Sequence, residues 1–319
     1  MVTFVITSLA MGSTVIIGQH IGEKKSEEAG NAVGTTIVLF LLIGVLLTVL
    51  LEIFAGDIVS LLQVPEESTE KAILYIRICS GGILVIIAYN VISGILRGIG
   101  NANLPFVFVG VACIFNILGD LFFTGLLHMD VAGVALATVL AQLISVIISA
   151  AVLRKQKMPI SFSKKQCCIH ARELKLILKV GVPIAIQEAM VQVSFLVINS
   201  IINQMGLLPS AGYGIAQKVV SFILLVPSSI MQSVSAFVAQ NIGAGKRKRA
   251  KQGFFTAILV GCSVGILIFC AGFFAGEQLS MPFTSDPEVI IAQSAAYLKG
   301  FSADCILTCI LFSSIGYFN

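Results

Sequence analysis

Val15-Ile-Ile-Gly-Gln-His-Ile-Gly22 and Ala236-Phe-Val-Ala-Gln-Asn-Ile-Gly243 are two versions of one sequence, and they decide how the chain is organised. Each version ends an apolar stretch and is followed at once by lysine or arginine residues. Their starting positions are 221 residues apart. Similarity at a fixed separation indicates a structural repeat, so the chain is predicted to contain two copies of one unit.

Two further matches occur at almost the same separation. Ala55-Gly-Asp57 matches Ala275-Gly-Glu277, and Pro65-Glu66 followed by Tyr75 matches Pro287-Glu288 followed by Tyr297. Three anchors at a nearly constant separation are hard to explain by chance, and they indicate a repeat of about 220 residues.

Composition places the repeat in a membrane. Hydrophobic residues make up 57% of the 319 residues and charged residues only 11%, and the mean hydropathy is +1.00. Soluble domains have about 45–50% apolar and about 25% charged residues. The chain is therefore predicted to be an integral membrane protein, which excludes a soluble enzyme, a nucleic-acid-binding protein and a disordered protein.

The spans are predicted to be helices, because the alternating pattern of a membrane strand is absent from the sequence. A span needs about 20 apolar residues. Eight runs satisfy this, at 31–53, 73–96, 105–127, 131–153, 176–203, 211–240, 252–274 and 288–319. Segment 1–22 is shorter and rich in small residues, so it is predicted to be part of a further helix.

Charge placement predicts the orientation of these helices. One set of alternate loops holds 16 of the 20 lysine and arginine residues, with the densest groups at 154–179 and 246–251. The other loops are mostly acidic. By the positive-inside rule the basic loops are cytoplasmic. Topology explains the basic run at 246–251, so no nucleic-acid partner is expected there.

The repeat and the spans together predict an all-α protein of twelve helices in two lobes. An even number of spans separates the two copies, so they have the same orientation. Residues 1–154 would form an amino-terminal lobe without its first helix and part of its second. Residues 155–175 would be a cytoplasmic linker, and residues 176–319 a carboxy-terminal lobe without its last two helices. The chain is thus expected to be a fragment that does not transport by itself.

Three acidic residues are predicted to lie at membrane depth. Asp120 shares a helical face with Asn116, and Asp304 precedes Thr308 by one turn. Glu188 begins a polar stripe that continues with Gln192, Asn199 and Asn203. A carboxylate in a medium of low dielectric constant binds a cation or takes up a proton. The alternative is that these groups serve as hydrogen bonds between helices.

The cysteine and histidine residues give no further site. Several of the 8 cysteines lie inside apolar runs, and they are expected to be reduced and packed as small hydrophobic residues. His20, His128 and His170 do not cluster in the sequence, so no metal site is predicted.

Several motifs, in order along nearly the whole chain, resemble those of the multidrug and toxic compound extrusion (MATE) family. The matching segments are Ile17–Gly22, Leu96–Asn101, Asn116–Asp120, Gly133–Thr138, Gly181–Gln187, Gly212–Ala216, Ala239–Gly245 and Gly316–Asn319. The resemblance implies two six-helix lobes around a central cavity. It also implies export of drugs or organic cations by alternating access, in exchange for Na⁺ or H⁺.

The resemblance also implies roles for particular residues. Asn116 and Asp120 match the fifth-helix pair of the amino-terminal cation site, with Thr138 as a polar sixth-helix member. Asp304 matches the tenth-helix acid of the other lobe. Some members carry a seventh-helix glutamate where this chain has Val191, so Glu188 is not its equivalent. The stripe of Gln187, Glu188, Gln192 and Asn199 is the candidate for substrate contacts.

Rival functions remain at this point. A flippase for lipid-linked saccharides would share the scaffold, but it would need basic residues in its cavity to hold a pyrophosphate, and the deep charges here are acidic. A membrane enzyme would need an Asp-rich motif or clustered histidines at the membrane surface. We therefore expect a monomeric antiporter in a bacterial plasma (inner) membrane, surrounded by lipid, with no cofactor besides its coupling ion.

Overall fold

The computed structural model describes residues 2–61, 66–155, 160, 163–283 and 288–319. The described part of the chain contains helices and turns and no strand. The long helices are α1 (Val2–Gly22), α2 (Ser26–Ile53), α4 (Glu66–Gly81), α5 (Ile83–Ile99), α6 (Asn103–Asp120), α7 (Asp130–Lys155), α8 (Ala171–Gln204), α9 (Leu207–Gly243), α10 (Arg247–Phe274) and α12 (Glu288–Phe318). Two short helices are α3 (Ala55–Leu61) and α11 (Gly276–Ser280), and Leu121–Leu126 forms a π-helical turn after α6.

The all-α membrane fold is confirmed. Within the described residues, 8 helices are long and apolar enough to cross a membrane, or up to 9 if a bent pair is one span. The bent pair is Ser68–Gly81 with Ile83–Ile99, which meet at an angle of 48°. The predicted run 73–96 is therefore not one straight helix, since it breaks at the Gly81-Gly82 pair. Segment 1–22, predicted to be only part of a helix, contains a stretch that meets the same criteria, Val5–Gly22.

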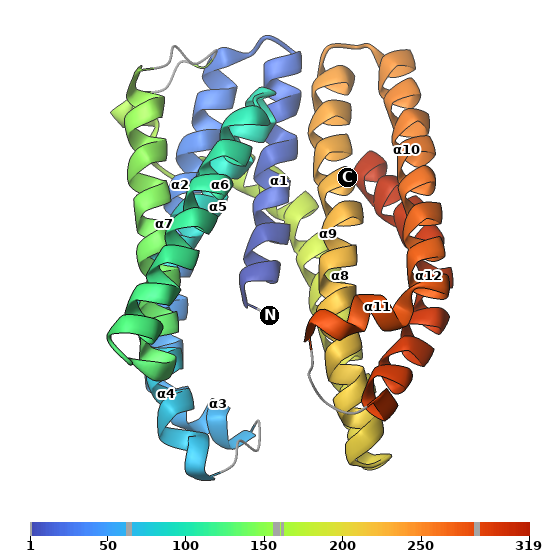
Figure 1. The fold of residues 1–319 in the computed structure, drawn as a ribbon. Coiled ribbons are helices and arrows are strands. Elements are labelled where there is room, and N and C mark those ends of the chain that lie inside the picture. The colour runs from blue at the N-terminus through green and yellow to red at the C-terminus, as the bar shows by residue number, and fades with distance from the viewer. Residues whose placement is uncertain (1, 62–65, 156–159, 161–162, 284–287) are drawn as a thin grey trace. The chain divides into compact units, whose positions relative to one another are not determined.

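The chain divides into two units, Val2–Ile184 and Ala185–Asn319 (Figure 1). In the first unit the side chains of Ile17, Phe40 and Ile177 are almost fully buried, which joins α1, α2 and the start of α8 in one core. In the second unit Val220 of α9 packs with Leu298 of α12. The predicted lobe boundaries at 154 and 176 stay a prediction.

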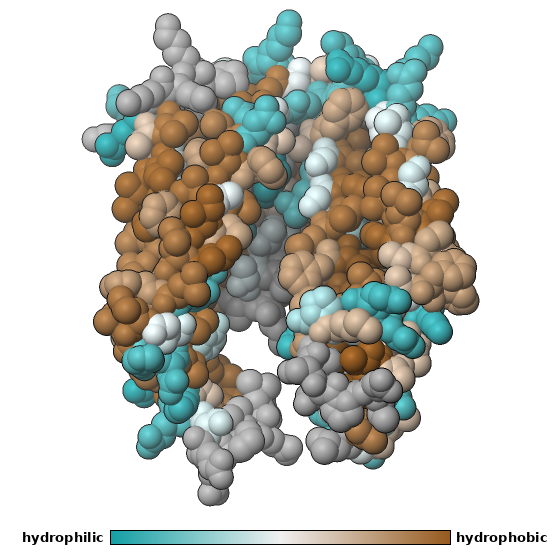
Figure 2. Space-filling model, in the orientation of Figure 1, coloured by the Kyte–Doolittle hydropathy of each residue, from teal (hydrophilic) through white to brown (hydrophobic). Residues whose placement is uncertain are grey.

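The outer faces of these helices suit a hydrocarbon solvent. Leu42, Leu46, Val49 and Ile53 follow one face of α2, and all four are exposed. Figure 2 shows hydrophobic side chains over the middle of the helices in each unit and hydrophilic side chains toward the helix ends. An apolar surface of this extent would be solvated by lipid and not by water.

The repeat recurs in the backbone with the same separation. Helices α2 and α10 both have 28 residues. The first and last residues of α10 lie 221 positions after the first and last residues of α2. The turns before them share their hydrogen bonds: Lys24 N–H donates to Ile21 O (3.1 Å) and Lys25 N–H to His20 O (2.9 Å), as Gly245 N–H donates to Ile242 O (2.9 Å) and Lys246 N–H to Asn241 O (2.7 Å). The anchors Pro65 and Pro287 lie outside the described residues.

The backbone of these two turns predicts that glycine is the most stable residue at their shared position. Lys24 and Gly245 occupy the same place, with φ of 60° and 71°. A left-handed conformation costs a side chain about 1 kcal/mol that glycine avoids. We expect Lys24→Gly to raise the free energy of unfolding by about 0.5–1 kcal/mol and Gly245→Ala to lower it by about 1 kcal/mol. Reversible unfolding in mixed micelles measures both, and a stabilising Gly245→Ala would contradict the prediction.

Candidate functional site

The first group of predicted site residues lies where α6 packs against α7, in the unit Val2–Ile184. Asn116 Nδ2 donates to Thr138 Oγ1 at 3.4 Å, and Thr138 Oγ1 donates to the carbonyl oxygen of Val134 at 3.0 Å. The helices approach closely here, since a Cβ added to Gly119 would lie 3.0 Å from the Cβ of Ala137. The structure thus brings Asn116 and Thr138 into contact, and their role in binding a cation stays a prediction.

Asp120 ends α6 one turn beyond Asn116. Its Oδ1 atom is buried and has no hydrogen-bond partner among the described residues. Its carbonyl oxygen accepts a hydrogen bond from Thr124 Oγ1, in the π-helical turn that follows. A buried carboxylate oxygen without a partner is costly, and protonation or a bound cation would remove that cost.

Tyrosine residues accompany two of the three predicted membrane acids, Asp120 and Asp304, which the sequence interpretation did not predict. Tyr75 of α4 is close enough to Asp120 to interact with it electrostatically, and Tyr297 of α12 has the same relation to Asp304. Tyr75 and Tyr297 are equivalent in the repeat, which is the signal that could have identified them. At the same separation of 222 the equivalent of Asp304 is Gly82, so Asp120 and Asp304 are not copies of each other.

The second group lies on α12 and α9, in the unit Ala185–Asn319. Thr308 Oγ1 donates to Asp304 Oδ2 at 2.9 Å. The Tyr297 ring packs edge-on against Tyr213 with 5.0 Å between centroids, and Gln217 Nε2 donates to the Tyr213 hydroxyl at 2.7 Å. Thr308 therefore holds the carboxylate of Asp304 by one hydrogen bond. Asp304 is an exposed residue, so an ion could reach it.

The predicted substrate stripe is partly connected. Gln192 Nε2 donates to Glu188 Oε1 at 2.9 Å, so these two α8 side chains act as one polar group. Gln187 and Asn199 are exposed on the same helix. Asn203, further along the stripe, accepts a hydrogen bond from Ser210 Oγ at 2.6 Å.

A groove between α9 and α10 contains none of the predicted residues. It has a volume of about 640 Å³ and is lined by residues that include Ser229, Phe237, Arg249, Gln252 and Thr256. The Arg249 guanidinium lies 5.7 Å from the centre of the Phe237 ring. Among the described residues that line it, Arg249 is charged and none is acidic, so the groove does not suit an organic cation.

Comparison with known proteins identifies the class to which this fold belongs. The model of the family MatE matches residues 1–122 and 183–319. A solved structure described as the outward-facing conformation of a multidrug resistance MATE family transporter of the MOP superfamily aligns with a TM-score of 0.91 and 23% identity. That alignment covers 98% of this chain and 70% of the other. The chain therefore belongs to the MatE family, a transporter family and not a family of enzymes.

Individual relatives are bacterial. The chain is 31% identical over 295 residues to the probable multidrug resistance protein YoeA of Bacillus subtilis, which covers 89% of this chain. It is 27% identical over 306 residues to the probable multidrug resistance protein NorM of Thermotoga maritima, covering 91% of this chain. The chain spans 63% of the length of each of these two relatives.

Proposed function

We propose that the protein containing this chain exports organic cations or drugs in exchange for Na⁺ or H⁺ by alternating access. The observation that carries the proposal is the buried Oδ1 of Asp120, which has no partner in the described structure. An acid of this kind is poorly stable when it is both charged and empty, so it gains or loses an ion as its surroundings change. Family membership supports transport, and the names of the relatives support drugs as the cargo.

Cation or proton binding at Asp120 and Asp304 would drive transport only through different affinities in the two states of the transporter. Asn116 and Thr138 would supply neutral oxygen ligands beside Asp120, and Thr308 would do so beside Asp304. Oxygen ligands suit a hard ion such as Na⁺, and the carboxylates alone suffice for H⁺. We propose a monomer in a bacterial plasma (inner) membrane with the basic loops in the cytoplasm.

The direct test is ethidium accumulation in a drug-sensitive bacterial strain. The reading frame that contains these 319 residues is expressed, together with whatever coding sequence flanks it in the genome. We expect less accumulation than with an empty vector, and dissipation of the ion gradient should abolish the difference. Comparing Na⁺ with Na⁺-free buffer at fixed pH identifies the ion. Equal accumulation in the two strains at verified expression would refute the proposal.

The α8 stripe predicts a substrate-specific effect. Glu188→Gln removes the charge but keeps the shape and the contact with Gln192. We expect the concentration of a cationic drug for half-maximal efflux to rise about tenfold, because one favourable charge contact with the drug is lost. The maximal rate should be retained. Efflux kinetics of a cationic and a neutral drug measure this, and an equal loss for both would contradict a role in cargo binding.

A further inference from the structure

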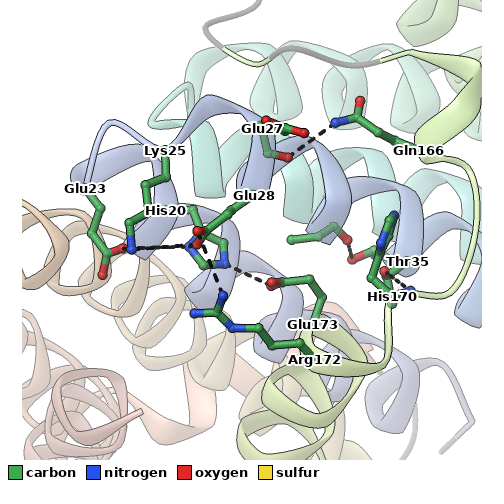
Figure 3. A network of polar contacts seen from close by, with 12 residues as sticks. His20, Glu23, Lys25, Glu27, Glu28, Thr35, Gln166, His170, Arg172 and Glu173 are labelled. Carbon is green, nitrogen blue, oxygen red and sulfur yellow. Dashed lines mark hydrogen bonds and ion pairs between the residues drawn. The ribbon is translucent and has the colours of Figure 1, made fainter.

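A polar cluster joins the ends of three helices in the unit Val2–Ile184 (Figure 3). His20 comes from the end of α1, Glu23 from the following turn, and Glu28 from the first turns of α2. Glu173 comes from the start of α8. The His20 side chain is only 7% exposed and that of Glu173 only 4%. Charged groups this deeply buried need partners that satisfy every polar atom.

The contact between His20 and Glu173 determines which ring nitrogen is free. His20 Nε2 lies 2.9 Å from Glu173 Oε2. An ionised carboxylate only accepts hydrogen bonds, so in the neutral form of the ring the proton lies on Nε2 and the lone pair on Nδ1. Among the residues that the structure describes, that Nδ1 atom is buried without a hydrogen-bond partner, and the same is true of Glu28 Oε2 beside it.

The free nitrogen points at two carboxylates. His20 Nδ1 lies 3.4 Å from Glu28 Oε2 and 4.0 Å from Glu23 Oε2, and the three ligand atoms lie within 4.8 Å of one another. Two ligands of a tetrahedral zinc ion, each about 2.1 Å from the metal, are about 3.4 Å apart. The His20–Glu28 separation already has this value, and a small rotation of Glu23 would complete the third corner.

The cluster attracts cations as it stands. Lys25 Nζ lies 2.8 Å from Glu23 Oε2 and 3.7 Å from Glu28 Oε2. The ammonium group of Lys25 thus already occupies the place between the two carboxylates that a metal ion would take. The Lys25 side chain is half-exposed, so it can leave for solvent when an ion takes its place.

We propose that His20 Nδ1, Glu23 and Glu28 bind a divalent transition-metal ion of the zinc type. Glu173 does not touch the ion. It orients the imidazole and strengthens it as a ligand, which is the usual partner of a metal-bound histidine. One nitrogen and two carboxylate ligands suit zinc and leave a fourth position for water. The bound ion would hold the adjoining ends of α1, α2 and α8 together.

The second copy of the repeat provides an internal comparison. Its turn has the same backbone hydrogen bonds, but the positions of His20, Glu23 and Glu28 hold Asn241, Ala244 and Arg249. Asn241 Nδ2 donates to the carbonyl oxygen of Phe237 at 2.8 Å. The turn geometry therefore does not require a histidine with two acids, and His20→Asn is a substitution that the same turn accepts elsewhere in this chain.

The test is zinc binding by the 319-residue chain, purified in detergent with a histidine-free tag. Cys167 and Cys168 are replaced by serine throughout, because Cys168 Sγ lies 3.3 Å from His170 Nε2 and could bind zinc itself. Competition with a chromogenic chelator gives affinity and stoichiometry, and Co²⁺ gives a ligand-field spectrum. We expect one strongly bound ion per chain, and we expect His20→Asn to weaken binding at least about 100-fold.

Three further variants separate metal binding from misfolding. Lys25→Ala removes the competing ammonium and should tighten zinc binding several-fold, a gain that a damaged protein would not show. Glu173→Gln should weaken it about tenfold, the usual effect of losing an orienting partner. His128→Asn, the same change at an exposed histidine, should have no effect. The proposal is overturned if the parent binds no zinc at micromolar concentration, or if His20→Asn binds it with equal affinity.

Discussion

Efflux is expected to fall to the level of an empty vector when Asp120 is replaced by asparagine. Asparagine keeps the size of the side chain and its place beside Asn116, but it can neither take up a proton nor balance a cation. The buried Oδ1 of Asp120 has no hydrogen-bond partner in the described structure, and an uncharged asparagine would leave this place without the charge that attracts an ion. Ethidium accumulation at equal membrane expression measures the effect.

A matched control distinguishes this effect from a general loss of negative charge. Asp130 begins α7, and its carboxylate makes an exposed ion pair with Lys71 at 2.9 Å. Such a surface pair contributes little to stability, so Asp130→Asn should leave efflux within about twofold of the parent. Unchanged efflux in Asp120→Asn would exclude Asp120 from ion coupling and would favour a role in helix packing.

The second large effect is expected for Asp304→Asn, which should also abolish efflux. Here the carboxylate is held by Thr308 and lies near Tyr297, and the chain has no repeat copy of this acid to replace it. Thr308→Val should keep transport but shift the ion concentration for half-maximal efflux several-fold, since it removes one hydrogen bond to the carboxylate. Glu277→Gln, at an exposed acid of α11, is the control. Full activity of Asp304→Asn would remove Asp304 from the mechanism.

Much of the fold follows from the sequence because a membrane helix must satisfy all of its backbone hydrogen bonds internally. Apolar runs therefore become helices wherever they are long enough, and the repeat predicts which runs correspond. The break at Gly81-Gly82 was not predicted, because the residues on both sides of it are apolar. Hydropathy does not report a change in the direction of the helix axis. Helix α1 has glycine and serine residues that lower its hydropathy, and its stretch Val5–Gly22 still meets the length and composition criteria for a span.

The site residues differ in how far the sequence could predict them. Asn116 and Thr138 are 22 positions apart on two helices, and only the family resemblance connected them before the structure did. The cluster around His20 is not apparent in the sequence, because it contains one histidine and not several. Its single histidine is completed by carboxylates from the adjacent turn, from α2 and from α8, and no spacing in the sequence links Glu173 to His20.

The matching turns after α1 and α9 also bear on how such a protein changes over time. After duplication, two copies of a gene segment drift apart, and what both retain marks what the architecture cannot lose. Here both copies have the same backbone hydrogen bonds at equivalent residues of the turn. Glu27 and Glu28 of one copy nevertheless correspond to Lys248 and Arg249 of the other. Opposite charges at these two equivalent positions leave the turn intact. The charge beside the turn can therefore differ between the two halves without a change in the backbone.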